Sequence, residues 1–182
     1  MKNFSLILIF VFFAYKAQAS IKNNIITKLQ NIKNISFYFE QNINGKIETG
    51  KCSIQYPKKI FCEYNLGNKK TLVSDGKSLV IKTLSSYYLY PLKNTPLDTI
   101  LNKDFLISKI NNLEERIIDD KFINYNFFEN ENEINLFFDR KTFNLIGWQT
   151  VDIYQNLSIT YLSAIIKNQK LNKNLFILPE RN

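Results

Sequence analysis

Residues 52–64 read CSIQYPKKIFCEY. Apolar residues recur at every second position on both sides of Pro57, which is the pattern of two half-buried strands joined by a turn. Folding the segment about Pro57 places Cys52 opposite Cys62. Directly opposed residues of antiparallel strands lie about 4.5–5.5 Å apart at Cβ, near the separation of about 3.8 Å that a disulfide needs. We therefore expect a β-hairpin bridged by Cys52 and Cys62; the alternative is a pair of buried free thiols.

Ahead of this hairpin the sequence predicts a helix. Ser20 is a favourable N-cap residue, and Asn34 marks the expected end of the helix. Five apolar residues between them recur at helical spacing: Ile21, Ile25, Ile26, Leu29 and Ile32. They form one stripe, so this helix must pack against another apolar surface.

The period changes from helical spacing to two after this helix. Phe37 and Phe39 then share one face of a strand. Asn44-Gly45 is a strong signal for a tight hairpin turn into residues 46–49. Gly50 is expected to open the first strand of the disulfide hairpin.

The middle of the chain continues as hairpins. Residues 74–77 predict a tight turn between apolar strands at 72–73 and 79–82, with Gly76 at a position that needs φ > 0. Residues 87–92 add a further apolar strand.

A second helical segment is expected after these strands. Thr95 is its expected N-cap, and Pro96 occupies the first helical position, where its missing N–H has no cost. Its short apolar face consists of Leu97, Ile100 and Leu101. Residues 104–113 are expected to continue as a second short helix.

The remainder returns to period two and completes the fold class. Strands are expected at residues 116–126, 133–140, 144–153, 157–167 and 174–178. Consecutive hairpins make an antiparallel sheet, which must bury one face by curling or by taking helices against it. We therefore expect a mainly β (α+β) fold, an incomplete antiparallel β-barrel (half-barrel) with an N-terminal helix and short helices filling its mouth.

The N-terminus has the pattern of a secretory signal peptide. Lys2 precedes a largely apolar run over residues 4–15, and Ala17-Gln18-Ala19 supplies the small residues that signal peptidase requires. Cleavage is expected between Ala19 and Ser20, leaving residues 20–182 as one domain. The alternative is a retained anchor, but such a run rises only about 18 Å as a helix against a hydrocarbon core of about 30 Å.

Composition argues against catalysis and against metal or cofactor chemistry. The chain has no His and two Cys, which excludes imidazole bases, His ligands and four-thiolate metal sites. Asp119 and Asp120 are expected on opposite faces of a strand, and Glu114-Glu115 in a loop, so no pair of carboxylates has the spacing that acid–base catalysis needs. We expect no catalytic residue, no metal and no cofactor, and thus no enzyme.

Charge and aromatic content indicate what kinds of partner the protein can bind. The net charge is +8, and loss of residues 1–19 removes two lysines and no acid, leaving +6. These bases are scattered in an exported chain, so we expect no nucleic-acid partner. The chain contains 15 Phe, 10 Tyr and one Trp. A plain core and a half-barrel with a large apolar concave face explain this content equally well.

Several motifs occur in a recognisable order: Phe39-Glu40-Gln41, Gly50 with Pro57, residues 72–79 (LVSDGKSL), Asn94-Thr95-Pro96-Leu97, Trp148 with Thr150-Val151-Asp152, and Leu175-Phe176 with Pro179. In this order and at these intervals, the chain resembles the LolA family of periplasmic outer-membrane lipoprotein carrier proteins. The resemblance covers nearly all of the chain after the signal peptide. Each motif alone is weak. The Val-Ser-Asp-Gly turn at residues 73–76 and the helix start at Asn94-Thr95-Pro96, found together after a signal peptide, are fairly specific.

The resemblance implies a function without covalent chemistry. Proteins of this family hold lipoprotein acyl chains in an apolar cavity inside a half-barrel closed by helices. Their partners are acylated lipoproteins, an inner-membrane lipoprotein-releasing ABC transporter and an outer-membrane receptor lipoprotein. We therefore expect a monomeric periplasmic carrier.

The same resemblance selects candidate site residues. Those expected to line the acyl cavity are Phe37, Phe39, Ile54, Tyr56 and Ile60, and those expected on the lid helix are Leu97, Ile100 and Leu101. Phe37 and Phe39 are alternatively ordinary core residues.

One residue departs from the family pattern. Where the family commonly has Arg before the Pro aligned with Pro57, this chain has Tyr56. In the family this Arg ties the lid helices to the barrel and matters for onward transfer. Tyrosine can donate one hydrogen bond but cannot form a multidentate ionic clamp. Either the lid is held differently here or release is controlled elsewhere.

Three other functions remain as alternatives. A lipoprotein-sensing envelope-stress module has the same fold but usually a second C-terminal domain, which we do not expect here. The receptor lipoprotein needs a lipidated N-terminal Cys, whereas the residue directly after the expected cleavage site is Ser20. An exported enzyme of unknown type is the third.

Overall fold

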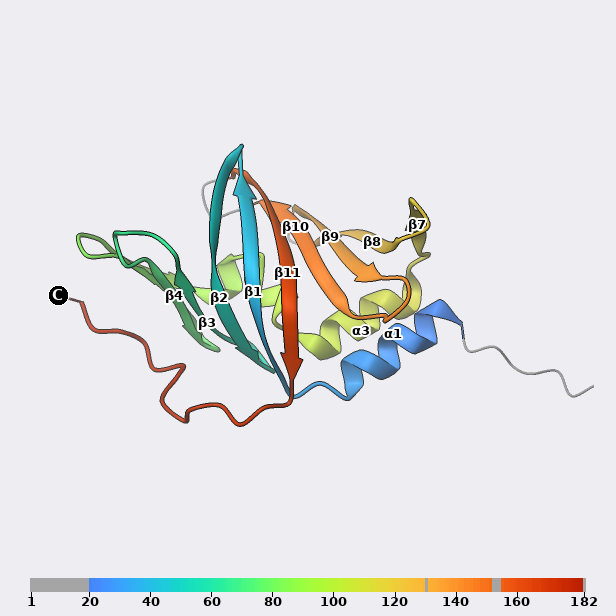
Figure 1. The fold of residues 1–182 in the computed structure, drawn as a ribbon, viewed down its shortest axis with the longest axis horizontal. Coiled ribbons are helices and arrows are strands. Elements are labelled where there is room, and N and C mark those ends of the chain that lie inside the picture. The colour runs from blue at the N-terminus through green and yellow to red at the C-terminus, as the bar shows by residue number, and fades with distance from the viewer. Residues whose placement is uncertain (1–19, 130, 152–154, 182) are drawn as a thin grey trace, which may run out of the picture.

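One antiparallel sheet contains every strand of the residues that the computed structural model describes, which are 20–129, 131–151 and 155–181. The order across the sheet is β6-β5-β4-β3-β2-β1-β11-β10-β9-β8-β7. The two edge strands, β6 and β7, do not pair with each other, so the sheet is not closed into a barrel. The mainly β half-barrel fold expected from the sequence is thereby confirmed (Figure 1).

The strands have the following bounds: β1 (Asn34–Ile43), β2 (Lys46–Gln55), β3 (Lys59–Tyr64), β4 (Thr71–Asp75), β5 (Ser78–Lys82), β6 (Tyr87–Pro91), β7 (Arg116–Ile118), β8 (Phe122–Glu129), β9 (Asn132–Asp139), β10 (Leu145–Val151) and β11 (Leu157–Lys167). The helices are α1 (Ile21–Gln30), α2 (Leu97–Ile100) and α3 (Lys103–Asn112), with a 3₁₀ turn, η1 (Leu92–Asn94), before α2.

The β2–β3 hairpin has the register expected from its sequence. Cys52 pairs with Cys62, and Ile54 pairs with Ile60. The two cysteines form a disulfide with their Cα atoms 4.1 Å apart. β2 runs without interruption from Lys46, so Gly50 lies inside this strand and does not open it.

Gly50 is required by close packing. A Cβ atom at this position would lie 2.1 Å from the Glu63 carbonyl oxygen and 2.7 Å from the Phe39 ring. No real Cβ approaches backbone so closely, so a side chain here would force β2 away from its neighbours.

Two turns have the residues that their backbone requires. Asn44 and Gly45 join β1 to β2 with φ values of 50° and 90°, as in a type I′ hairpin turn. Between β4 and β5, Gly76 has a φ of 104°. There the Asp75 carboxylate accepts hydrogen bonds from the backbone N–H groups of Lys77 and Ser78. Both turns were expected from the sequence.

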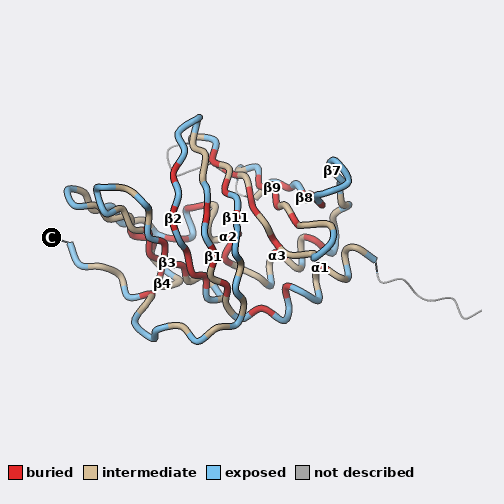
Figure 2. The backbone as a smooth tube through the Cα atoms, in the orientation of Figure 1, coloured by how far each residue is buried: buried red, intermediate tan, exposed pale blue. Residues whose placement is uncertain are grey.

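The helices cover one side of the sheet. Figure 1 shows α1 and α3 side by side below β9 to β11, and α2 behind β1 and β2. Ser20 caps α1 by accepting a hydrogen bond from the Asn23 N–H, as expected. Ile25 and Leu29 of α1, and Leu106 and Ile110 of α3, belong to the same buried core as the inward residues of the strands. Figure 2 shows buried stretches of the backbone in the strands at the middle of the sheet and in the helices.

Helix α1 ends earlier than the sequence indicates. It stops at Gln30, although Ile32 is still buried. The chain turns at Asn31 because Asn168 holds it there, donating to the Asn31 carbonyl and accepting from the Lys33 N–H. This contact joins residues far apart in the sequence, so helical periodicity could not predict it.

Thr95 does not cap α2, so this expectation was wrong. Its hydroxyl donates backwards to the Leu92 carbonyl at 2.8 Å, which stabilises η1 instead. Pro96 occupies the N-cap position without a side-chain hydrogen bond. A threonine hydroxyl can bond to either neighbouring turn, and here the preceding 3₁₀ turn competes successfully.

Two strand predictions were also wrong. Residues 116–126 form two strands, β7 and β8, because Asp119 and Asp120 adopt positive φ values of 49° and 53° and reverse the chain between them. These carboxylates therefore do not alternate across a strand. Residues 174–176 form turns and residues 177–178 have no regular structure; burial of Phe176 anchors this segment, which pairs with no strand. Residues 152 and 153 of the expected 144–153 strand, and the signal peptide, lie outside the described residues.

Candidate functional site

The inner face of the sheet encloses an apolar cavity of about 150 Å³. Its walls come from β1 to β5, β10 and β11, and one end of α2 covers it. Most of the lining is aliphatic, aromatic or disulfide: Phe39, Ile43, Cys52, Ile60, Cys62, Tyr64, Leu72, Leu79, Ile81, Pro96, Leu97, Trp148 and Val151. The polar lining residues are Gln41, Lys70, Thr95, Thr150, Ser158 and Thr160.

Strand alternation and register explain why these residues meet. Phe39 pairs with Gly50, and Gly50 pairs with Tyr64, so the Phe39 and Tyr64 rings meet over a glycine, with centroids 4.9 Å apart. The missing side chain at Gly50 leaves room for this aromatic contact. The disulfide Cys52–Cys62 forms the next layer of the same wall.

The η1–α2 segment covers one end of this cavity, and we call it the lid. Leu97 is half-buried and lines the cavity, whereas Ile100 and Leu101 are fully buried in the core. The segment therefore contributes Thr95, Pro96 and Leu97 to the cavity wall and is anchored by Ile100 and Leu101.

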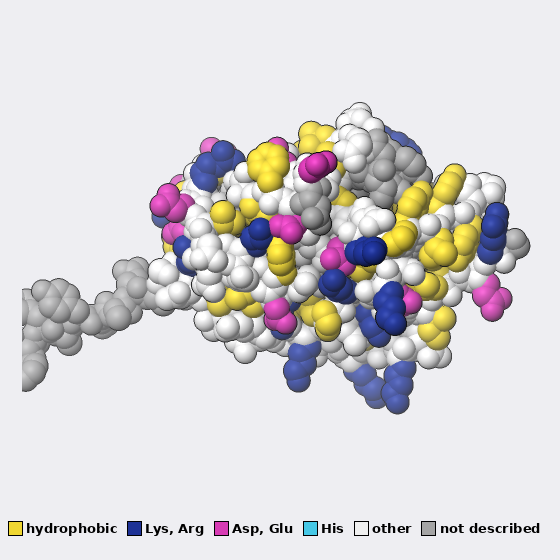
Figure 3. All heavy atoms as spheres, turned by 180° about the vertical axis from the view of Figure 1, so that it is seen from behind, with side chains coloured by type: hydrophobic (Ala, Val, Ile, Leu, Met, Phe, Trp, Pro, Cys, Tyr) yellow, Lys and Arg dark blue, Asp and Glu magenta, His cyan; other side chains and the backbone are white. Residues whose placement is uncertain are grey.

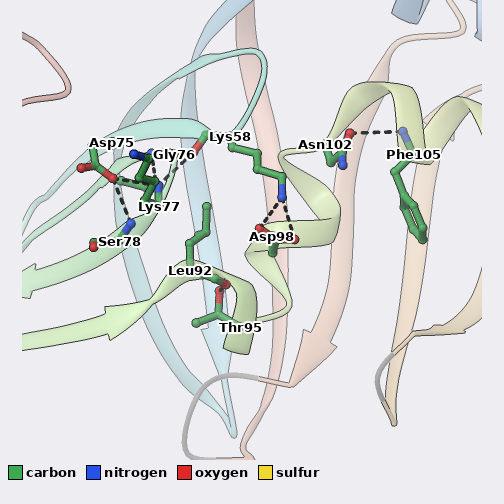
Figure 4. A network of polar contacts seen from close by, with 11 residues as sticks. Lys58, Asp75, Gly76, Lys77, Ser78, Leu92, Thr95, Asp98, Asn102 and Phe105 are labelled. Atoms are coloured by element: carbon green, nitrogen blue, oxygen red, sulfur yellow. Dashed lines mark hydrogen bonds and ion pairs between the residues drawn. The ribbon is translucent and has the colours of Figure 1, made fainter.

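A polar clasp ties the lid to the β2–β3 turn. The Lys58 Nζ donates to both oxygens of Asp98 on α2, at 2.8 and 3.0 Å, and its backbone N–H donates to the Leu101 carbonyl at 2.9 Å. Buried Ser74 holds the turn by donating to the Lys58 carbonyl at 3.0 Å. Figure 4 shows Lys58 reaching across to Asp98, with the Asp75 turn beside it. We call these contacts of Lys58 with Asp98 and Leu101 the lid clasp.

Tyr56 lies away from the cavity. It lines a separate polar depression together with Lys33, Lys59 and Lys103, and its backbone N–H donates to the Lys33 carbonyl. Burial raises the pKa of the Tyr56 phenol to about 12, so the side chain is neutral at physiological pH. The side-chain contact between the β2–β3 turn and the lid therefore comes from Lys58, two residues after Tyr56.

A buried carboxylate lies on the inner face of β2. Glu48 is 3% exposed and pairs with Lys46 at 2.8 Å and with Lys70 at 2.5 Å. Burial opposes its ionisation, but the hydrogen bonds from both lysines outweigh that effect and lower the pKa of Glu48. Lys70 also lies 4.1 Å above the Tyr64 ring. The Lys70 ammonium group, which lines the cavity, therefore already has the Glu48 carboxylate as its ion-pair partner.

The expected site residues divide into three groups. Phe39 and Ile60 line the cavity, as does Leu97 on the lid. Phe37 and Ile54 are buried in the core without lining the cavity, as are Ile100 and Leu101, and Tyr56 lies in the depression described above. Sequence reasoning did not single out Leu72, Leu79, Trp148 or the polar residues of β10 and β11. Alternation within those strands was the available signal, but it did not indicate which inward residues face open space.

The described residues form neither a metal site nor a membrane-spanning helix. Within residues 20–129, 131–151 and 155–181, no three Cys, Asp, Glu or His side chains lie close enough to hold a metal ion. Over the same ranges, no helix has the length and apolarity to cross a membrane.

Fold and cavity together define a class of protein, a half-barrel with an apolar interior covered by a helix. The sequence model of one such family, described as outer membrane lipoprotein carrier protein LolA, matches residues 30–178, so the chain belongs to the LolA family. A search of curated protein sequences finds no significant match.

Solved structures resemble the chain in fold. An uncharacterized conserved protein from Thermus thermophilus has a TM-score of 0.52 at 8% identity, over 87% of this chain and 93% of that one. The LolA superfamily protein NE2245 from Nitrosomonas europaea has a TM-score of 0.45 at 9% identity, over 88% and 99%. LprF from Mycobacterium bovis has a TM-score of 0.46 at 12% identity, over 85% and 95%.

Proposed function

We propose that this chain is a periplasmic carrier that shields the acyl chains of lipoproteins released from the inner membrane and delivers them to an outer-membrane receptor. The observation that carries the proposal is the apolar cavity under a clasped lid, in a chain of the LolA family. The carrier works by non-covalent burial alone and uses no cofactor.

The energetics of acyl chains require such a protein. Burial contributes about 0.8 kcal/mol per methylene, so exposing a sixteen-carbon chain to water costs on the order of 12 kcal/mol. An acylated protein therefore does not diffuse freely between membranes. A carrier has to cover the chains and also to release them.

We infer from the size of the cavity that this structure corresponds to a closed state of the carrier. A volume of about 150 Å³ is well below the roughly 300–1,000 Å³ of ligand pockets. Loading therefore requires Leu97 and the rest of α2 to move outward. When the binding-competent state is only partly populated, apparent affinity falls by that fraction, which favours transfer to a tighter receptor.

The lid clasp is our candidate for the control of this opening. In the resembled family, an Arg before the proline ties the lid to the barrel, and this chain has Tyr56 there. Lys58 lies on the other side of the same proline and makes both an ionic and a backbone contact with the lid. We infer that Lys58 takes over the tethering role.

Export and partners complete the proposal. Residues 1–19 are a signal peptide cleaved after Ala19, and residues 20–182 act as one monomeric carrier. An inner-membrane lipoprotein-releasing ABC transporter loads it, and a receptor lipoprotein unloads it.

Hydrophobic side chains on the outside gather over the end of the molecule where β3 to β6 lie (Figure 3), and Leu84, Tyr88 and Leu89 are among the exposed ones.

Mass spectrometry of the exported protein tests the proposal. The full chain is produced in a Gram-negative host and purified from the periplasm, and its N-terminus and bound acylated molecules are identified. We expect Ser20 at the N-terminus and acylated cargo on the wild type. Leu97→Trp, which fills the cavity from the lid, should lose cargo, whereas Leu84→Trp on an exposed loop should retain it. A protein without acylated cargo, whose depletion leaves lipoproteins correctly sorted, is not a carrier.

A further inference from the structure

One buried hydroxyl in the cavity wall has no partner. Within the described part of the chain, three buried side-chain polar atoms make no hydrogen bond, namely Asn34 Oδ1, the Tyr125 hydroxyl and Thr160 Oγ1. Thr160 is the one of these that lines the apolar cavity, and the residue is 4% exposed. Buried polar groups are nearly always paired, so an exception in a ligand cavity calls for a specific explanation.

The neighbouring polar groups do not supply the missing partner. Thr160 on β11 pairs across the sheet with Gln41 on one side and Trp148 on the other. The Gln41 amide donates to the Ser158 hydroxyl at 2.8 Å and accepts from the Tyr64 hydroxyl at 3.3 Å. Thr150 donates to the Val151 carbonyl at 3.3 Å. These groups satisfy one another, so the Thr160 hydroxyl stays unpaired in a residue that lines the cavity.

Most of the polar lining of the cavity lies toward one end. Gln41, Lys70 and Ser158 lie toward the Asn44-Gly45 turn, together with the apolar residues Ile43 and Val151, whereas Leu72, Leu79 and Ile60 line the other part. An amphiphilic ligand placed along this axis has its hydrocarbon at the apolar part and its first polar group near Thr160.

We infer that Thr160 Oγ1 donates a hydrogen bond to the carbonyl oxygen of an acyl ester or amide. This inference rests on the proposed function and specifies the ligand class: an acyl derivative whose carbonyl enters the cavity, not a bare hydrocarbon chain. One hydroxyl can satisfy a neutral carbonyl acceptor. It cannot compensate the desolvation of a phosphate or a free carboxylate.

The charges near Thr160 favour a neutral acceptor as well. Lys70 is the cation that lines the cavity, and Glu48 already pairs with it at 2.5 Å while also pairing with Lys46. Tyr64 stays neutral because burial and the nearby Glu48 carboxylate raise the pKa of its phenol. No unpaired cation among these residues offers a free carboxylate a counter-charge.

The contact forms only in the open state. Thr160 Oγ1 has less than 1 Å² of accessible surface in the closed structure. The ligand carbonyl therefore reaches it only after the side chains around it have moved, and the hydrogen bond contributes to the loaded state alone.

A matched pair of lipids tests the inference. Palmitoyl lysophosphatidylcholine contains an ester carbonyl, and its hexadecyl ether analogue lacks only that oxygen. Binding to the mature wild-type protein and to Thr160→Val is measured by the fluorescence of Trp148, which is the one tryptophan in the sequence and lines the cavity. A single hydrogen bond makes the ester bind about five-fold tighter than the ether to wild type. Thr160→Val should remove this preference by weakening the ester only, and Thr160→Ser should restore it.

One control variant and three contrary results complete the test. Ser163→Ala removes an exposed hydroxyl from the same strand and should keep the preference. Equal binding of ester and ether by wild type refutes the carbonyl contact while leaving the carrier function intact. Equal losses for both lipids in Thr160→Val show a structural role and also refute it. Binding of neither lipid by wild type refutes the proposed function and this inference with it.

Discussion

Breaking the lid clasp should make the protein bind acyl chains more tightly. Asp98→Asn removes the ionic contact of α2 with Lys58, while Leu101 keeps its backbone hydrogen bond to the turn. Because the closed lid competes with the ligand for the cavity, a weaker clasp raises the open fraction. Apparent affinity rises in proportion.

The magnitude follows from the exposure and geometry of the pair. The side chains of Lys58 and Asp98 are 32% and 26% exposed, so solvent screens their interaction substantially. Pairs of this kind contribute about 0.2–1 kcal/mol, and contact with both carboxylate oxygens places this one near the upper value. We therefore expect about a five-fold gain in apparent affinity from the loss of about 1 kcal/mol.

The assay is a titration of the mature protein with an acyl lysophospholipid, followed by Trp148 fluorescence. Glu129→Gln is the matched control, because the Lys109–Glu129 pair has the same 2.8 Å distance and exposures of 34% and 26% but lies away from the lid. This control should leave affinity unchanged. Raising NaCl from about 0.05 to 0.5 M should tighten binding by wild type and not by Asp98→Asn. If Asp98→Asn binds as wild type does, or more weakly, the clasp does not hold the lid closed.

Three further predictions concern the scaffold. Gly50→Ala should lower the free energy of unfolding by about 3 kcal/mol, since its Cβ would meet backbone at 2.1 Å, whereas Gly67→Ala, with nothing within 4 Å, should be near neutral in urea denaturation. Reducing the disulfide between Cys52 and Cys62, which are 10 residues apart, should lower stability by about 3 kcal/mol, measured with and without reductant. Because the folded pKa of Glu48 lies below 4.5, its ion pairs stabilise the protein above that pH and are lost as pH falls through the folded pKa. Glu48→Gln should therefore reduce the loss of stability on acidification, followed by denaturation at several pH values.

Local hairpins were predictable because a few neighbouring residues determine their register. The two-residue turn at Asn44-Gly45 and the alternation around Pro57 each allow one pairing that buries the apolar face. The disulfide followed from the same register, since Cys52 and Cys62 are directly opposed. Hairpins of this kind build most of the half-barrel from neighbouring segments.

The errors arose where distant contacts or competing local bonds decide the structure. The Asp119-Asp120 turn contains no glycine, and the backbone reverses there through positive φ values that aspartate tolerates. The end of α1 depends on Asn168, and the C-terminal segment is held by burial of Phe176 and not by strand pairing. Such outcomes depend on the assembled fold and not on the segment itself.

The candidate site was only partly predictable for a similar reason. Alternation correctly put Phe37, Phe39 and Ile54 on buried faces, but only Phe39 of these lines the cavity. Whether an inward residue faces a helix or open space depends on where the helices pack. The contact of Lys58 with Asp98 joins residues 40 positions apart and has no sequence pattern.

Quenching of Trp148 by brominated acyl chains tests the central claim most directly. The residue is the one tryptophan of the sequence, is 5% exposed, and lines the cavity. A lysophosphatidylcholine with bromine atoms at mid-chain should quench its fluorescence saturably, and an unbrominated acyl competitor should reverse the quenching. The cavity-filling Leu97→Trp variant, with its added tryptophan as reference, should lose saturable quenching. If the brominated chain binds the protein without quenching Trp148, or does not bind at all, acyl chains do not occupy this cavity and the account is wrong.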